Sequence, residues 1–270
     1  MNKKNRIIGY NLYFKIAMML FIVFTIGCKS KIENSSKLFE DSFFSEYLNE
    51  ERILTLYFPN NFDVNKKYNI VYATDGQIID ETYKLELDRL IRNGEIEPTI
   101  IVGVNSNEKE VEDTGLNFRN FEYVKNLSTE PNLSQLYEKH YFFFTKEVIN
   151  YIHKKYNLEI GNKVFYGCSN GAGFGFNLMC DSDNIFDYFF LFSISGADRS
   201  LINDLHETKS NVYISYGDKE PFPLIENIKI IEKELNDKNY HFYLNVFKGG
   251  HSRKSWEKEF FIALKRLNRN

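Results

Sequence analysis

The sequence has 270 residues and a formal net charge of −3, from 34 basic and 37 acidic side chains. At 43% hydrophobic and 16% aromatic residues, with 5 Pro and 15 Gly, it excludes a disordered, collagen-like or low-complexity chain. The length fits one domain with a sizeable core, and the slight acidic excess without a basic stripe argues against a nucleic-acid partner.

The first 27 residues are typical of an export signal. Four basic side chains accompany the apolar run of residues 16–26, which is too short to span a bilayer alone. Residues 25–28 (TIGC) resemble the bacterial lipoprotein box, in which the cysteine is lipidated. Thr25 stands where that box usually has Leu, so a retained anchor and a cleaved, soluble export form remain alternatives.

We therefore expect a lipoprotein-type signal peptide over residues 1–27, lipidation of Cys28, and a polar tether over residues 28–42. The protein would then be exported and held by its lipid in the bacterial cell envelope, with the membrane as a partner. Residues 43–270 are expected to form a single domain.

Strand-like runs recur through that domain and alternate with stretches of helical period. Several runs are nearly continuous in Val, Ile, Phe and Tyr, as in strands covered on both faces. The predicted strands are 52–58, 68–74, 99–104, 163–166, 189–194, 211–216 and 241–247, and the predicted helices are 79–92, 136–156, 172–180, 223–236 and 254–267. This alternation predicts an α/β fold with a mostly parallel, doubly wound sheet.

Three connections refine this expectation. The link between the first two predicted strands (PNNFDVNKK) contains no helix and predicts an antiparallel N-terminal hairpin at one edge of the sheet. Residues 105–134 form the longest irregular stretch, which in a compact domain is usually functional or mobile. The segment from 194 to 211 is too short for a large cap domain.

Residues 167–171 read Gly-Cys-Ser-Asn-Gly between a predicted strand and a helix of small residues. G-x-S-x-G in this context is the nucleophile elbow, where a strained turn lifts Ser169 above the sheet and the flanking glycines avoid a collision. A glycine-rich turn is the structural alternative. A dinucleotide loop is disfavoured because residues 171–175 have G-x-G-x-G spacing.

Partners for a nucleophilic serine follow later strands. His251 comes after two glycines beyond the last strand and is the candidate general base. The candidate acid is Glu220, with Asp218 as the alternative, and the order serine, acid, histidine is that of α/β-hydrolases. No metal or nucleotide motif is present, and the three cysteines lack zinc spacing, so no metal and no cofactor is expected.

Together these segments resemble the esterase-D-type putative esterase family, which includes feruloyl and siderophore esterases. The resemblance rests on YNIVYATDGQ at 68–77, Arg119 with Glu122 and Tyr123, the GCSNG elbow, and Gly249-Gly250-His251 followed by Trp256. It implies an α/β-hydrolase fold and a serine esterase that cleaves a small-molecule or glycan ester through an acyl-enzyme, the substrate being a siderophore, feruloyl or acetyl-sugar ester.

The resemblance also implies roles for particular residues. Ser169 would be the nucleophile, His251 the base and Glu220 the acid, and the backbone N–H groups of Gln77 and Asn170 would form the oxyanion hole. Contacts to substrate are assigned to Arg119, Tyr123 and Trp256, for which packing roles stay open. A catalytically inactive, esterase-like binding lipoprotein and an acyltransferase of the same fold remain alternatives.

Overall fold

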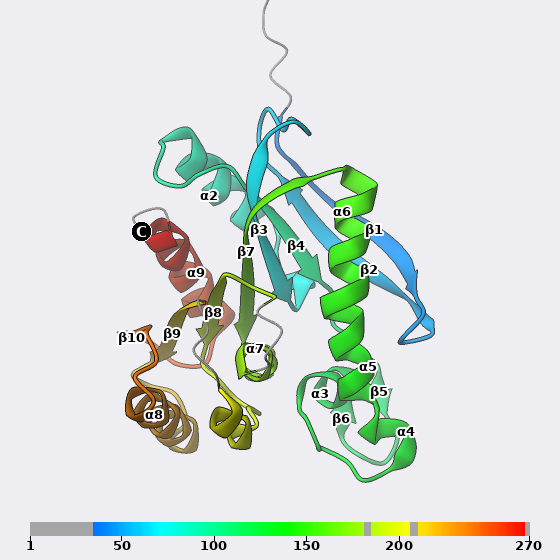
Figure 1. Ribbon diagram of the computed structural model, residues 1–270, viewed down its shortest axis with the longest axis vertical. Coiled ribbons are helices and arrows are strands. Elements are labelled where there is room, and N and C mark those ends of the chain that lie inside the picture. The colour runs from blue at the N-terminus through cyan, green and yellow to red at the C-terminus, as the bar shows by residue number, and fades with distance from the viewer. Residues whose placement is uncertain (1–34, 181–184, 206–209, 268–270) are drawn as a thin grey trace, which may run out of the picture. The chain divides into compact units, whose positions relative to one another are not determined.

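An eight-stranded mixed sheet organises the computed structural model, which describes residues 35–180, 185–205 and 210–267 (Figure 1). The strand order is β1-β2-β4-β3-β7-β8-β9-β10, and all neighbours from β4 to β10 are parallel. The strands are β1 (Lys37–Ser45), β2 (Glu50–Phe58), β3 (Lys67–Thr74), β4 (Thr99–Val104), β7 (Glu159–Cys168), β8 (Tyr188–Phe192), β9 (Asn211–Gly217) and β10 (Phe242–Phe247). The predicted mostly parallel sheet is confirmed.

Helices cover both faces of this sheet. They are α2 (Glu81–Arg92), α3 (Phe118–Tyr123), α4 (Pro131–Ser134), α5 (Leu136–Phe142), α6 (Ile149–Tyr156), α7 (Asn170–Cys180), α8 (Phe222–Asp237) and α9 (Arg253–Leu267), with short 3₁₀ turns η1 (Gly76–Ile78) and η3 (Arg199–Asp204). A π-helical segment, η2 (Phe143–Val148), joins α5 to α6 within the single helix predicted there.

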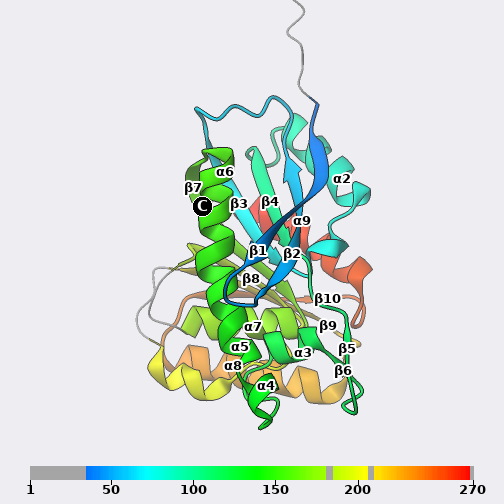
Figure 2. The same ribbon diagram turned by 90° about the vertical axis from the view of Figure 1, so that its right-hand side faces the viewer.

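The core is divided by the sheet because successive strand residues point to opposite faces. Ile70, Tyr72 and Phe165 pack with α6, α7 and α8 on one face. Val71 and Tyr166 pack with α2 and α9 on the other. Figure 2 shows α6 in front of the sheet and α9 behind it. This double coverage explains why the inner strands read as continuous apolar runs.

The predicted hairpin between the first two strand runs is wrong. β2 pairs antiparallel with β1 on one side and with β4 on the other, so β4 separates β2 from β3. All six residues of β4 are buried, and a position inside the sheet satisfies that demand. The nine-residue link is long enough for the chain to skip one strand position. The antiparallel N-terminal hairpin is therefore formed by β1 and β2.

The N-terminal boundary also differs from the expectation. Residues 37–42, predicted as tether, belong to the edge strand β1, whose half-exposed polar pattern hides its strand character. Cys28 and the predicted signal peptide lie outside the described residues. Within the described part of the chain, no helix is long and apolar enough to cross a membrane.

One long connection has more regular structure than expected, and a second agrees with the expectation. Residues 105–134 contain the small hairpin β5 (Glu110–Val111) and β6 (Leu116–Asn117) and the helices α3 and α4. Helix α3 begins at a capping box formed by Asn117 and Asn120. Between β8 and β9, η3 is the one helical element of the described residues, which agrees with the absence of a large cap domain.

Candidate active site

Ser169 occupies the sharp turn between β7 and α7. Its φ of 55° is in the left-handed region, which a serine adopts only when its surroundings enforce it. The backbone is held on both sides, since Ser169 N–H donates to Phe192 O (2.9 Å) and Ser169 O accepts from Ser195 N–H (3.2 Å). A Cβ atom on Gly167 would lie 2.4 Å from the carbonyl oxygen of Gly171, so the turn requires glycine there.

His251 links this serine to a carboxylate. Its Nε2 lies 3.0 Å from Ser169 Oγ, and its Nδ1 lies 2.7 Å from Glu220 Oε2. The Glu220 side chain has no exposed surface, whereas about a third (34%) of the His251 side chain is exposed. Because an ionised carboxylate only accepts hydrogen bonds, Nδ1 carries the imidazole proton and Nε2 is left to accept from the serine hydroxyl.

Asp218, the alternative acid, lies away from the imidazole. Its carboxylate accepts from Lys248 Nζ (2.8 Å) and from Gly249 N–H (3.0 Å). These two bonds lower the pKa of Asp218. Asp218 therefore braces the turn that leads to His251, and Glu220 is the carboxylate that contacts the ring.

The two backbone groups expected to form an oxyanion hole lie at helix starts. Gln77 is the second residue of η1 and Asn170 the first of α7, positions whose N–H groups have no partner within their own helix. The Gln77 side chain is turned away and bonds to Ser106, with its Nε2 2.6 Å from Ser106 Oγ. A Cβ on Gly76 would lie 2.2 Å from the Gly103 carbonyl carbon, which explains the glycine in this turn.

Arg119 and Tyr123 hold the residue before that turn. Asp75 has φ 56° and ψ 45° and caps η1. Arg119 donates to the Asp75 carboxylate twice, from Nε to Oδ1 at 2.5 Å and from Nη2 to Oδ2 at 2.8 Å. The Tyr123 hydroxyl accepts from Asp75 N–H at 3.3 Å. Burial lowers the pKa of Arg119, but the hydrogen bonds and charge of Asp75 outweigh it and raise that pKa.

This placement corrects one expectation about substrate contacts. Tyr123 is completely buried and lies between Arg119 and Phe174, so it cannot contact a substrate directly. Glu122, its neighbour on α3, forms a buried two-pronged ion pair with Arg52 of β2 at 2.7 and 3.1 Å. The Arg119–Tyr123 segment thus anchors α3 to the sheet and to the η1 turn.

Trp256, the third expected contact, lies beside the histidine. Its ring meets the His251 ring edge-on, with centroids 4.7 Å apart and planes at 87°. Its indole N–H donates to Ser193 Oγ at 2.8 Å. Ser193 was not singled out from the sequence, because an isolated serine after a strand carries no motif. It contacts the carboxylate through Glu220 Oε1 at 2.5 Å.

An open cleft of about 520 Å³ lies over Ser169 and His251. Its lining combines apolar side chains at the start of α8 with the residues that follow β8. The remaining lining residues are Ile194, Ser195, Gly196, Ala197, Pro221, Pro223, Leu224 and Asn227. The cleft therefore offers apolar contact area and one amide side chain to a group bound at the serine.

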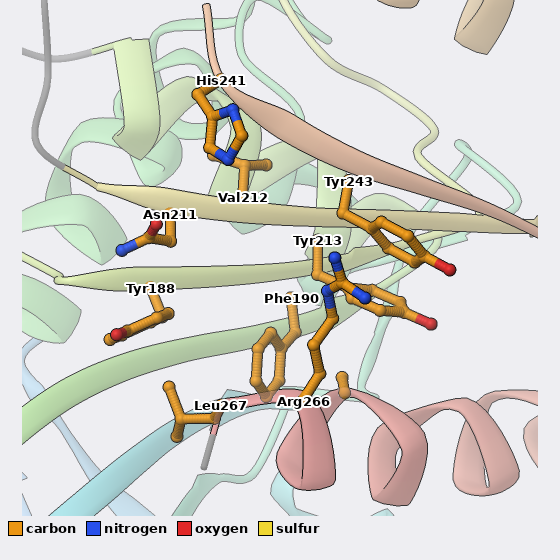
Figure 3. A pocket seen from close by; sticks show the side chains of 10 residues that line it. Tyr188, Phe190, Asn211, Val212, Tyr213, His241, Tyr243, Arg266 and Leu267 are labelled. Atoms are coloured by element: carbon orange, nitrogen blue, oxygen red, sulfur yellow. The ribbon is translucent and has the colours of Figure 1, made fainter. Parts of the chain in front are cut away.

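A smaller pocket of about 90 Å³ lies at the opposite, amino ends of β8, β9 and β10 (Figure 3). Arg266 rises from α9 with its guanidinium carbon 3.7 Å from the centroid of the Tyr243 ring. His241 lines this pocket, but none of its described lining residues is a serine, cysteine or carboxylate. The serine–histidine–carboxylate arrangement of the open cleft is therefore not repeated in the described lining of this pocket.

Cys168, next to the nucleophile in sequence, points to the α2/α9 face and is buried. Its Sγ lies 3.3 Å from the Tyr166 hydroxyl. Burial raises the pKa of the Cys168 thiol, so the thiolate required for thiol chemistry is suppressed.

A serine on a strand–turn–helix elbow, above the carboxyl edge of a doubly wound sheet, defines the α/β-hydrolases, and this chain has that architecture. A family model described as Putative esterase matches residues 45–267. The chain belongs to this esterase family and is a carboxylic ester hydrolase.

Individual proteins match this chain at low sequence identity. The chain is 25% identical over 248 residues to "Uncharacterized protein YjcH" of Bacillus subtilis (strain 168), a match that covers 84% of this chain and 96% of that protein. A solved ferulic acid esterase superposes with a TM-score of 0.66 at 21% identity, covering 87% of this chain and 98% of the other. Siderophore hydrolase EstA from Aspergillus nidulans superposes with a TM-score of 0.69 at 13% identity, covering 85% and 94%. These superpositions establish the shared fold.

Proposed function

We propose that Ser169, His251 and Glu220 are the catalytic triad of this esterase. The observation that carries the proposal is the continuous hydrogen-bonded chain from Ser169 Oγ through both nitrogens of His251 to the buried carboxylate of Glu220. Each member follows the carboxyl end of a different strand, which is the edge where open α/β sheets bind ligands.

The reaction proceeds in two halves. His251 Nε2 takes the proton from Ser169 Oγ as the oxygen attacks the ester carbonyl, and Glu220 stabilises the imidazolium that forms. The N–H groups of Gln77 and Asn170 stabilise the oxyanion of the tetrahedral intermediate. His251 returns the proton to the leaving alcohol, which leaves an acyl group on Ser169. Water then repeats the sequence and releases the acid.

For the substrate, we propose a small acyl ester, with feruloyl, siderophore and acetyl-sugar esters as the candidates. The apolar side chains that line the cleft over Ser169 support an acyl group that is itself partly apolar, since such side chains contribute mainly by removing apolar surface from water. The names of the ferulic acid esterase and siderophore hydrolase of the same fold support the first two candidates.

The triad is tested by reacting the purified protein with a fluorophosphonate probe and mapping the adduct by mass spectrometry. We expect the adduct on Ser169, and we expect Ser169→Ala and His251→Ala to lower kcat on p-nitrophenyl acetate by at least about 10³-fold while the protein stays folded. A folded, fully active Ser169→Ala protein would contradict the proposal. Methyl ferulate, a trilactone siderophore and acetylated xylose then rank the substrate candidates by kcat/KM.

We also propose that the chain is exported and held in the cell envelope by a lipid on Cys28. The support is the basic stretch, short apolar run and Gly27-Cys28 ending of the first 28 residues. All residues of the proposed triad and oxyanion hole lie after residue 35, in a unit that is compact by itself. Anchoring would therefore concern where the enzyme acts and leave its chemistry unchanged.

A further inference from the structure

Ser193 lies at the end of β8, between the carboxylate of Glu220 and the indole of Trp256. It is completely buried and has a φ of 53°, in the left-handed region. Its N–H donates to Ser215 O of the neighbouring strand at 2.7 Å, which fixes the backbone at this point. Because a strained backbone conformation costs free energy, we looked to the hydrogen bonds of the buried Ser193 side chain for what stabilises it.

The hydrogen bonds of the Ser193 hydroxyl have a defined direction. The indole N–H of Trp256 is a donor only, so Ser193 Oγ must accept that bond, at 2.8 Å. The hydroxyl proton is then free to be donated, and Glu220 Oε1 lies 2.5 Å away. Trp256 therefore donates to Ser193, and Ser193 donates to Glu220.

Glu220 consequently has both carboxylate oxygens occupied. Oε2 accepts from His251 Nδ1–H and Oε1 accepts from Ser193. A carboxylate with no exposed surface is held in one orientation by donors that replace the water it has lost. Trp256 also packs against the His251 ring, which it meets edge-on.

We propose that Ser193 and Trp256 are positioning residues that act on His251 through Glu220, holding the carboxylate in the orientation in which it orients the imidazole. This inference rests on the proposed triad. It assigns Trp256 a role behind the histidine in place of the expected contact with substrate.

The first test removes the hydroxyl in two ways. Ser193→Ala and Ser193→Gly both lack it but have opposite backbone preferences at this φ, since glycine adopts it without strain. We expect both to lower kcat on p-nitrophenyl acetate by roughly tenfold to a hundredfold, the range for a hydrogen bond to a charged group, with KM changed less than about twofold. In proton NMR, the downfield His251 Nδ1–H resonance should move upfield and broaden in both variants.

The second test uses the indole. Trp256→Phe keeps an aromatic edge near His251 and removes the N–H, so Ser193 can still donate to Glu220 but is free to rotate. We expect a smaller loss of kcat, about threefold, because the bond to the carboxylate survives. The double variant Ser193→Gly/Trp256→Phe should lose no more kcat than Ser193→Gly alone, since both changes break one chain of hydrogen bonds.

The result that overturns the inference is a kcat within about twofold of wild type, with an unmoved Nδ1–H resonance, in both Ser193 variants. Strictly additive losses in the double variant would also overturn it. Urea unfolding and circular dichroism of each variant identify any loss caused by misfolding, and Ser193→Gly remains informative if Ser193→Ala does not fold. If Ser169→Ala is active, the proposed triad fails. If Ser169 is essential and the Ser193 variants are unaffected, this inference alone fails.

Discussion

His140 is completely buried on α5, among the aromatic rings of Tyr123, Phe143 and Phe174. Its Nδ1 lies 3.4 Å from a carboxylate oxygen of Glu122, yet neither ring nitrogen has a hydrogen-bond partner among the described residues. Burial lowers the pKa of His140 well below its ordinary value, and the positive charge of Arg52 lowers it further. His140 therefore stays neutral in the folded protein.

A neutral, buried histidine makes stability depend on pH. The unfolded chain binds a proton on His140 below about pH 6.5 and the folded chain does not, so acid favours unfolding. Between about pH 7 and pH 5.5, the wild type should lose about 1 kcal/mol more free energy of unfolding than His140→Phe, whose ring fits the aromatic surroundings. Urea unfolding of both proteins at the two pH values measures this difference, and equal losses would show that His140 is protonated in the fold.

At the scale of elements, the η1 turn depends on α3. The two-pronged Arg119–Asp75 pair fixes the residue whose left-handed backbone starts the turn, and Gln77 presents its N–H two residues later. Arg119 itself is fixed because α3 is tied to β2 by Glu122 and Arg52. A change in α3 should therefore shift the Gln77 N–H in the proposed oxyanion hole.

We expect Arg119→Met to lower kcat on p-nitrophenyl acetate by about 10- to 100-fold, because a displaced donor no longer meets the oxyanion. The pair is largely buried, so breaking it should also lower the free energy of unfolding, by about 3 kcal/mol. Gln77→Ala is the matched control: it leaves the backbone N–H in place and should cost much less kcat. Steady-state kinetics with chemical denaturation decides this, and a larger loss in Gln77→Ala would speak against a backbone donor.

Some parts of the fold and site are readable in the sequence and others are not. The inner strands are predictable because burial on both faces leaves a continuous apolar run, as in β4. Ser169 and His251 stand out because a short motif and a strand end mark them, whereas the strand end before Glu220 also carries Asp218 and leaves the choice of acid open. By contrast, β1 is a half-exposed edge strand with a polar pattern, and no local signal shows which strand it joins.

Contacts between distant residues explain what sequence reasoning missed at the site. Ser193 is 27 residues from Glu220 and 63 from Trp256, and nothing near it in the chain indicates that the three meet. The same holds for Tyr123, which the sequence places in a long irregular stretch as a substrate contact but which is completely buried. Such residues are identified only once the strand order places their elements side by side.

At the scale of the whole molecule, the anchor and the catalytic unit should be separable. We expect the full chain, produced in bacteria, to incorporate labelled palmitate and to sediment with membranes. Cys28→Ser should do neither and should keep its kcat on p-nitrophenyl acetate, because the proposed site lies within the compact unit of residues 35–270. Membrane association that persists without lipid labelling in Cys28→Ser would favour a retained apolar anchor.

The order of the proposed triad along the chain has a consequence for synthesis on the ribosome. β7 delivers Ser169 first, β9 then delivers Glu220, and β10 and α9 bring His251 and Trp256 last. A nascent chain that has reached α7 carries a serine with no base to deprotonate it, and domains of this kind fold as units. With the proposed triad, we expect ester hydrolysis to begin only after translation has passed α9, and we expect prematurely terminated products to be inactive.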